Sequence, residues 1–189
     1  MKFKILIPIL TVLQSFSPAV PAQDLQFYRE DIVFRLNDSS MATDAVYRFC
    51  NVGEKDIITN LFYPFPGKTM ELVDSIVVMN DNTYEFISYR NTRTGILFEI
   101  SVPGYGQVAY RVFFRQRLEE KKFTYILTST ESWSRPLEFA NFELQVPDGI
   151  TLDSLSYSPD SVDYRGQIRH YYWKKKDFMP VMDFEVVFH

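Results

Sequence analysis

The sequence predicts an all-β fold, an antiparallel β-sandwich of roughly ten or more strands with no substantial helix after residue 22. Three observations carry this prediction. The chain is 16% aromatic, with 17 Phe and 12 Tyr, and such side chains suit pleated, half-buried strands better than helices. Apolar and polar residues alternate with a period of two in several segments. Turn-forming residues separate these segments at short intervals.

The first 22 residues have the features of a secretory signal peptide. A basic start precedes an apolar run over residues 5–13, and small residues end the segment at Ala22. The apolar run is much shorter than the roughly 20 residues that cross a bilayer. We therefore expect cleavage after Ala22, a single domain over residues 23–189, and a periplasmic or secreted location. The residue after Ala22 is not cysteine, so we expect no lipid anchor, and no transmembrane helix after cleavage.

Three segments in the middle of the chain show the clearest alternation, and they predict half-buried antiparallel strands. Their apolar faces consist of Ile96, Phe98, Ile100 and Val102, then Val108, Tyr110, Val112 and Phe114, and then Ala140, Phe142, Leu144 and Val146. Further strands are expected near residues 25–36, 43–51, 56–63, 72–79, 84–89, 122–129, 152–157, 168–174 and 182–188.

Two stretches resemble exported bacterial β-sandwich proteins of unknown function. The first runs from Tyr47 to Ile57 and on to Tyr63-Pro64-Phe65-Pro66, and the second joins Trp173 to the segments 177–180 and 183–186. The first stretch is also similar to the opening hairpin of vault-type and inter-alpha-trypsin-inhibitor-type β-sandwich domains, which act in protein interaction. Both resemblances imply a β-sandwich, and neither implies a catalytic residue.

The residues that carry most enzyme chemistry are scarce. The chain has one cysteine, Cys50, and two histidines, His170 and His189, too few for a zinc site without carboxylates. It has no Gly-x-Ser-x-Gly motif and no phosphate-binding glycine loop. We therefore expect no enzyme, no metal and no cofactor. The net charge of −4 disfavours a nucleic-acid partner, which requires clustered positive charge.

Four residue sets have a structural interpretation that we prefer. We expect Cys50 to be a partly buried thiol, His170 to pack across strands, and Trp173 to lie in the core. Arg111, Arg115 and Arg117 share one face of a strand. We expect that face to be solvated and paired with acidic neighbours, with an anionic-ligand patch as the alternative.

The candidate binding residues are Trp133 and Arg135, which we place in a short polar loop between strands. A turn does not need tryptophan, so the indole either packs over the end of the sandwich or contacts a ligand or partner. We predict a non-enzymatic binding module that recognises an envelope protein or a surface glycan through loops or an edge strand. Two alternatives remain: a small outer-membrane β-barrel of eight strands, and a glycan-active enzyme with two carboxylates across a cleft.

Overall fold

The computed structural model describes residues 24–67 and 69–189, and the predicted signal peptide lies outside them. The described residues form thirteen strands and two short 3-10 helices. The strands are β1 (Leu25–Leu36), β2 (Ser40–Asn51), β3 (Ile57–Pro64), β4 (Val73–Asn80), β5 (Tyr89–Asn91), β6 (Gly95–Val102), β7 (Gln107–Arg117), β8 (Lys122–Tyr125), β9 (Leu137–Pro147), β10 (Leu152–Leu155), β11 (Ser161–Arg165), β12 (Ile168–Phe178) and β13 (Phe184–Phe188). The helices are η1 (Thr69–Leu72) and η2 (Thr128–Trp133).

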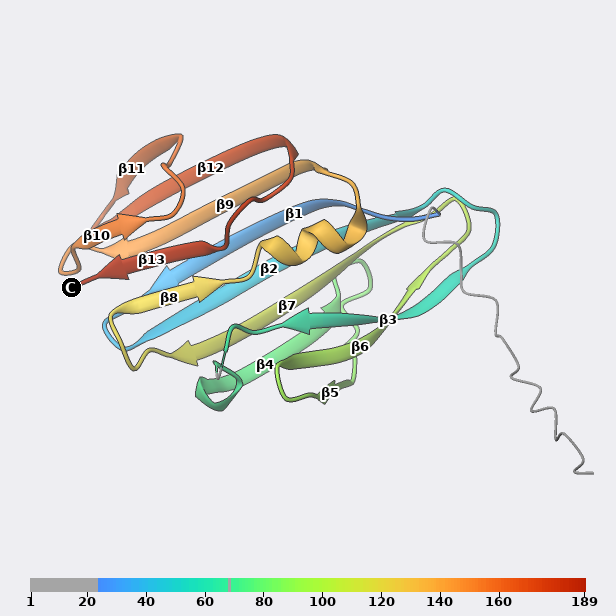
Figure 1. Ribbon diagram of the computed structural model, residues 1–189, viewed down its shortest axis with the longest axis horizontal. Coiled ribbons are helices and arrows are strands. Elements are labelled where there is room, and N and C mark those ends of the chain that lie inside the picture. The colour runs from blue at the N-terminus through green and yellow to red at the C-terminus, as the bar shows by residue number, and fades with distance from the viewer. Residues whose placement is uncertain (1–23, 68) are drawn as a thin grey trace, which may run out of the picture.

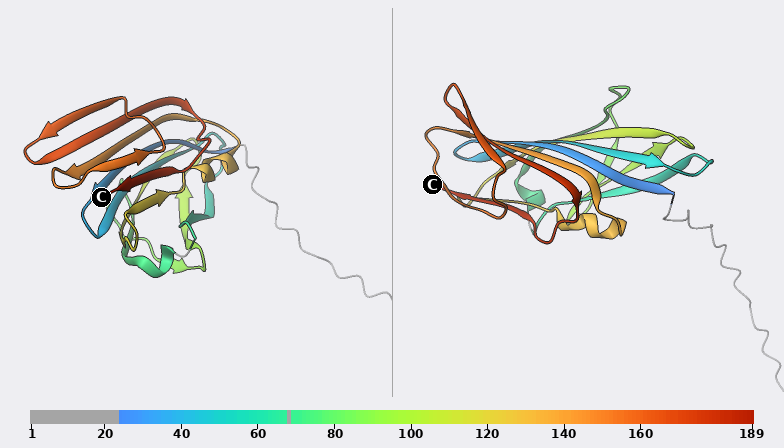
Figure 2. Two further views of the ribbon diagram at one scale, coloured as in Figure 1. Left: turned by 60° about the vertical axis from the view of Figure 1, so that its left-hand side comes forward. Right: turned by 90° about the horizontal axis from the view of Figure 1, so that it is seen from above.

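The strands form one large sheet and two small ones. The large sheet has seven strands in the order β11-β12-β9-β1-β2-β7-β4, and the small sheets have the orders β10-β13-β8 and β3-β6-β5. Both small sheets cover the same face of the large sheet (Figures 1 and 2). Phe34 of β1 stacks on Phe184 of β13, and Tyr63 of β3 packs edge-on against Phe114 of β7. The predicted all-β sandwich is therefore confirmed.

The alternating segments form the core as the sequence predicts. Every member of the three predicted apolar faces, such as Phe98, Val112 and Leu144, is buried. Trp173 is fully buried, and its indole N–H donates to the carbonyl of Tyr157 over 3.1 Å. Aromatic pairs join the layers, because large rings from the facing sheets fill the space between them.

The structure differs from the prediction in four places. β1 pairs with β9 in parallel, since about a hundred residues separate these strands and no hairpin dictates their direction. β11 is not predicted; it has only five residues, and although Val162 and Tyr164 alternate with polar residues, all five are exposed. Most of the expected strand over 84–89 is not a strand, and the end of the expected strand over 122–129 belongs to η2.

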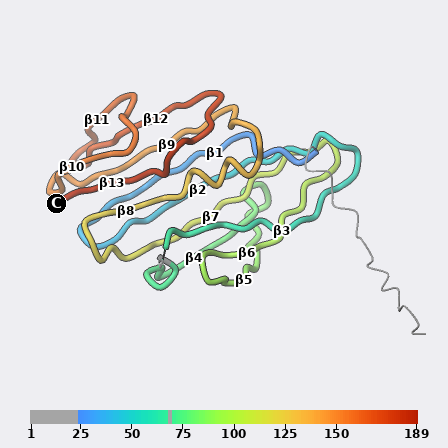
Figure 3. The backbone as a smooth tube through the Cα atoms, in the orientation of Figure 1, coloured from blue at the N-terminus to red at the C-terminus, as the bar shows by residue number. Residues whose placement is uncertain are grey.

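The strands lie in open sheets, each of which has two edge strands. The alternative of an eight-stranded closed barrel is therefore wrong. Figure 3 shows how the chain returns repeatedly to the large sheet, so that β1, β2, β7 and β9 lie side by side along its length. Among the described residues, no helix is long and apolar enough to cross a membrane.

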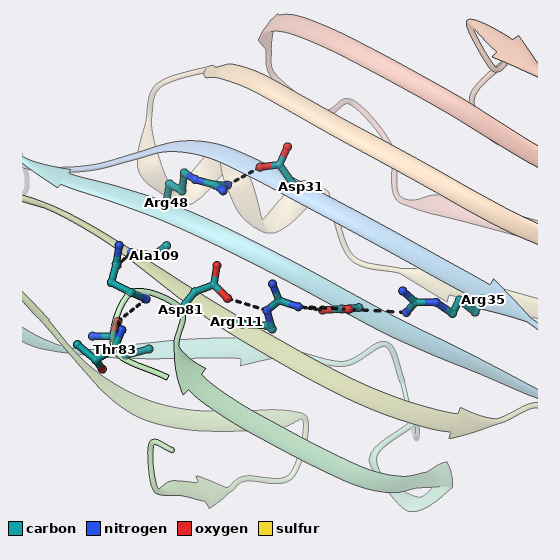
Figure 4. A network of polar contacts seen from close by, with 10 residues as sticks. Asp31, Arg35, Arg48, Asp81, Thr83, Ala109 and Arg111 are labelled. Carbon is teal, nitrogen blue, oxygen red and sulfur yellow. Dashed lines mark hydrogen bonds and ion pairs between the residues drawn. The ribbon is translucent and has the colours of Figure 1, made fainter. Parts of the chain in front are cut away.

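The outer face of the large sheet carries a network of ion pairs (Figure 4). Arg111 contacts both Asp81, at 2.7 Å, and Asp44, at 3.3 Å. Arg117 contacts Asp74 at 3.1 Å. These pairs confirm the expected solvated face for two of the three arginines in the β7 stripe.

Candidate functional site

An open groove separates the two small sheets. One wall is β3, the edge strand of its sheet, and the other consists of the chain after β8 together with η2. Its volume is about 1240 Å³. The exposed surface of the lining is more apolar than polar, although about half of its residues are polar: Leu25, Ile57, Thr59, Asn60, Leu61, Phe62, Pro64, Ile126, Thr128, Ser129, Glu131, Ser132, Trp133, Ser134 and Arg135. A concave, mostly apolar surface with a few polar groups is typical of a ligand site.

The β3 wall presents unpaired backbone groups to the groove. Phe65 N–H bonds to Thr94 at the end of the β3–β6 ladder, and bonded and non-bonded pairs alternate in antiparallel strands. The odd-numbered residues of β3 therefore bond to β6, and the N–H groups of Ile58, Asn60 and Phe62 point outward. No hydrogen bond among the described backbone groups joins these three to another segment. The edge of β3 is thus open to pairing with another strand.

The opposite wall depends on a side chain from a distant part of the chain. Asp183, in the segment before β13, accepts hydrogen bonds from the backbone N–H groups of Leu127 and Thr128, both 3.1 Å. It also accepts the Thr128 hydroxyl at 2.8 Å. A carboxylate that satisfies the first N–H groups of a helix stabilises its start. Asp183 therefore fixes η2 where the sequence alone predicts the end of a strand.

The structure places both candidate residues, Trp133 and Arg135, on the groove. Trp133 is the last residue of η2, so its placement in a loop was wrong; Ser134, in the left-handed conformation, ends the helix. The half-buried indole packs on Phe27 and Phe49, with ring centroids 5.8 and 5.5 Å apart. Arg135 is exposed at the rim. Trp133 therefore packs on the core, as one interpretation expects, and also lines the groove; its contact with a ligand or partner stays a prediction.

A small side cavity continues from the groove into the core. Six residues line both spaces: Leu61, Phe62, Pro64, Ile126, Ser129 and Trp133. The cavity has a volume of about 50 Å³ and reaches Glu30, a residue of β1 that is only 2% exposed. Glu30 lies between Tyr47 of β2 and Ala140 of β9 on the core face of the large sheet. Its Oε1 atom has no hydrogen-bond partner within residues 24–67 and 69–189.

Three tyrosines surround the same cavity, from β2, β3 and β8. Tyr47 donates to Tyr63 over 3.0 Å, Tyr63 donates to Tyr125 over 3.3 Å, and the hydroxyls of Tyr47 and Tyr125 are also in contact. Burial and the nearby Glu30 carboxyl raise the pKa of Tyr125 and of Tyr47. The hydroxyls therefore remain protonated and bond mainly to one another.

Burial also changes the acidity of Glu30. Removal from water raises the pKa of its carboxyl from 4.5 to about 8, and the charge of Asp31 adds to this effect. The cavity lining contains no basic side chain. At neutral pH the carboxyl is therefore mostly protonated. Its Oε1 atom is available to hydrogen-bond a ligand group that enters the cavity.

Sequence reasoning missed Glu30, although a signal for it was present. In strict alternation Glu30 shares a face with Ile32, Phe34 and Leu36, so one acidic residue interrupts an apolar face. The bulge between Phe27 and Arg29 then brings Phe27 to the same inner face. An acid at a core position of a strand is rare unless it has a partner or a function.

The remaining polar clusters do not form a comparable site. His170 Nδ1 lies 2.7 Å from Glu143 on the large sheet, where it joins β12 to β9 as a cross-strand contact. Burial of the half-buried Cys50 raises the pKa of its thiol. In residues 24–67 and 69–189, no group of three or more His, Cys, Asp or Glu is arranged to hold a metal ion.

Comparison with known families supports part of the sequence-based resemblance. A family described as a domain of unknown function, DUF4424, matches residues 113–187, which extend from β7 to β13 and include η2. The resemblance to β-sandwich proteins of unknown function is confirmed over this part of the chain. No curated protein matches the sequence.

Solved structures share the fold. A Legionella pneumophila protein, described as a candidate nutrient-binding protein, aligns with a TM-score of 0.67 and 14% identity over 87% of this chain and 67% of that one. An M1 zinc metallopeptidase from Deinococcus radiodurans aligns with a TM-score of 0.54 and 8% identity, over 87% of this chain and 42% of the peptidase. These identities show a common fold alone. The chain spans less than half of the peptidase, and its 189 residues contain no His-Glu-x-x-His zinc motif.

Proposed function

We propose that this protein is a non-enzymatic binding module, exported from the cell, that holds an extended segment of a partner polypeptide in the groove along β3. The open edge of β3 is the observation that carries the proposal. A segment laid beside this edge would pair with the N–H and C=O groups of Ile58, Asn60 and Phe62, as peptides do when they add a strand to a sheet.

The side chains of the groove suit the same ligand. Phe62 lines the groove and is 46% exposed, and Ile58, on the same edge strand beside the groove, is 61% exposed. This is unusual because exposed apolar edge strands promote unwanted pairing. Trp133 on the facing wall offers a rigid aromatic surface, and Arg135 at the rim offers several hydrogen-bond donors. These features support a protein ligand over a glycan.

A small organic solute is the second candidate, favoured by the description of the similar Legionella protein as a candidate nutrient-binding protein. Such a solute would bind the same walls through Trp133 and would not require the backbone edge of β3. The two candidates therefore predict different effects for changes to that edge.

A matched pair of substitutions at Asn60 separates them. Peptides that bind the full exported protein are first selected from a random library, and a solute library is screened in parallel. Asn60→Pro removes one outward N–H at an edge position, where proline is tolerated, and Asn60→Ala retains it. We expect Asn60→Pro to weaken peptide binding about tenfold, which corresponds to one lost hydrogen bond with an unpaired partner, and Asn60→Ala to have little effect.

The outcomes are distinguishable when the melting temperatures of both variants match that of the natural protein. Loss of peptide binding in Asn60→Pro alone supports strand addition. A ligand that is lost on Trp133→Ala but unaffected by Asn60→Pro supports the solute candidate. Binding that survives Trp133→Ala, Arg135→Ala and Asn60→Pro would show that the groove is not the site.

A further inference from the structure

A buried carboxyl, that of Glu30, lies at the base of the groove. Glu30 Oε1 accepts no hydrogen bond, although burial of an unpaired polar group costs on the order of 1 to 3 kcal/mol. An apolar residue, as at Ile32 or Phe34 on the same strand, would fill this core position without that cost. The cost is offset if a group from a ligand enters the cavity and bonds to the carboxyl.

The residues around Glu30 determine which charge a ligand group in the cavity is expected to carry. The titratable groups that face it are Tyr47, Tyr63 and Tyr125. Asp31, the next residue of β1, also acts on its charge but lies on the opposite face of the sheet, where it pairs with Arg29 and Arg48. None of the facing groups is positively charged, and the cavity lining contains no Lys, Arg or His. An anion would find no positive charge in this lining of rings, apolar side chains, hydroxyls and the acid Glu30, so the cavity disfavours anionic ligands.

The aromatic lining points to a cation. Rings of Phe27, Phe49, Phe62 and Trp133 line the cavity together with the three tyrosines. Ring faces attract ammonium groups, and the attraction increases where water is excluded. A carboxylate beside such rings supplies the opposite charge and a strong hydrogen-bond acceptor.

The size of the cavity limits what enters it. Its volume is about 50 Å³, and one water molecule requires about 10 to 15 Å³ by this measure. The cavity therefore holds about three to five heavy atoms, which is enough for an ammonium group with its last two methylenes. The rest of the ligand would pass between Phe62 and Trp133, which line both the cavity and the groove.

We propose that this cavity is a subsite for a primary ammonium group, supplied by a lysine side chain of the segment bound along β3, and that Glu30 is its counter-ion. This inference rests on the proposed function, and it adds a side-chain specificity that strand pairing alone does not provide. A free alkylamine shares the chemistry and would enter the same cavity without occupying the edge of β3.

Binding of the ammonium group is coupled to proton release. The free carboxyl is mostly protonated at pH 7 because burial raises its pKa to about 8. A bound cation favours the carboxylate, so the proton leaves to solvent as the ammonium group enters. We expect close to one proton released per ligand at pH 7, and little release well above pH 8.

Calorimetry on the full exported protein tests the subsite with n-pentylamine and with peptides. The binding enthalpy is measured at pH 7 in buffers of different ionisation enthalpy, which gives the number of protons released. We expect n-pentylamine to bind with proton release, 1-pentanol to bind at least tenfold more weakly, and Glu30→Gln to abolish both the preference and the proton release. The shift of the Trp133 indole N–H signal on amine addition reports occupancy of the cavity independently of stability.

The peptide measurements separate this inference from the proposed function. We expect replacement of the critical lysine by norleucine to weaken binding at least tenfold in the natural protein and to have little effect in Glu30→Gln. If peptide binding is weakened by Asn60→Pro but not by replacement of the critical lysine with norleucine, the ammonium subsite is wrong and the groove function stands. A second result would be that Glu30→Gln abolishes amine binding while no peptide is weakened by Asn60→Pro. This result would support a subsite for free amines and would refute the proposal that a lysine of a bound segment supplies the ammonium group. Equal binding of n-pentylamine to Glu30→Gln and the natural protein would overturn the subsite.

Discussion

Replacement of Glu30 by glutamine should change how the stability of the protein depends on pH. In the unfolded chain the carboxyl ionises at its ordinary pKa of 4.5, whereas burial keeps it protonated in the folded protein up to about pH 8. Between these values the folded state binds more protons than the unfolded state. The contribution of Glu30 to stability therefore falls as the pH rises, and it levels off above pH 8.

The size of the effect follows from the two pKa values. Each unit of difference corresponds to 1.36 kcal/mol, so Glu30 should remove about 3 kcal/mol from the free energy of unfolding between pH 5 and pH 8. Glutamine has a similar shape and does not titrate. The lowered pKa values of Asp31 and Glu143 act in the opposite direction, but mainly below pH 5, where these groups ionise.

Urea unfolding followed by tryptophan fluorescence at pH 5, 6, 7 and 8 measures this contribution. We expect Glu30→Gln to gain about 3 kcal/mol relative to the natural protein across this range. Glu131→Gln, an exposed position on the groove, is the matched control and should show no such trend. A difference between Glu30→Gln and the natural protein that is constant with pH would refute the buried, protonated state of Glu30.

Four further outcomes are expected. Asp183→Ala should cost about 1 to 2 kcal/mol through loss of the cap on η2, and should weaken ligand binding; unchanged stability by urea unfolding would contradict the capping role. Phe142→Ala should cost about 3 to 5 kcal/mol, because it empties a core position that is 4% exposed. Cys50, partly buried and with a raised pKa, should react slowly with thiol reagents in the folded protein and quickly in urea. Gly95→Ala should disturb the β3 wall, since a methyl group there would lie 2.1 Å from the carbonyl oxygen of Tyr63; a crystal structure of the variant with β3 unmoved would contradict this.

Alternation in the sequence was sufficient to predict the sandwich and much of its core. Residues such as Ile96, Val112 and Leu144 point inward because a strand with one buried face repeats its apolar residues every second position. β11 is a short strand in which Val162 and Tyr164 alternate with polar residues, but all five residues are exposed and its pairing with β12 buries no apolar face. A short edge strand with no buried face is therefore hard to predict from alternation over a few residues.

The groove could be predicted only in part. Trp133 and Arg135 stood out because a polar connection does not need an indole, and the structure places both on the groove. The open edge of β3 depends on the order of strands in space, which local sequence does not specify. The position of η2 depends on Asp183, more than fifty residues away in the chain. The cavity around Glu30 is formed by rings from several strands that are distant in sequence, so local sequence does not predict it.

Hydrogen exchange at the edge of β3 tests the central claim most directly, because it reports on the backbone groups that the ligand is proposed to bind. In the free protein, the amide protons of Ile58, Asn60 and Phe62 should exchange quickly, whereas those of Thr59 and Leu61, which bond to β6, should exchange slowly. Saturation with a selected peptide should slow exchange at the first three by an order of magnitude or more. If the peptide binds and these three amide protons still exchange at their free rates, the ligand does not add a strand to β3, and the account of the groove is wrong.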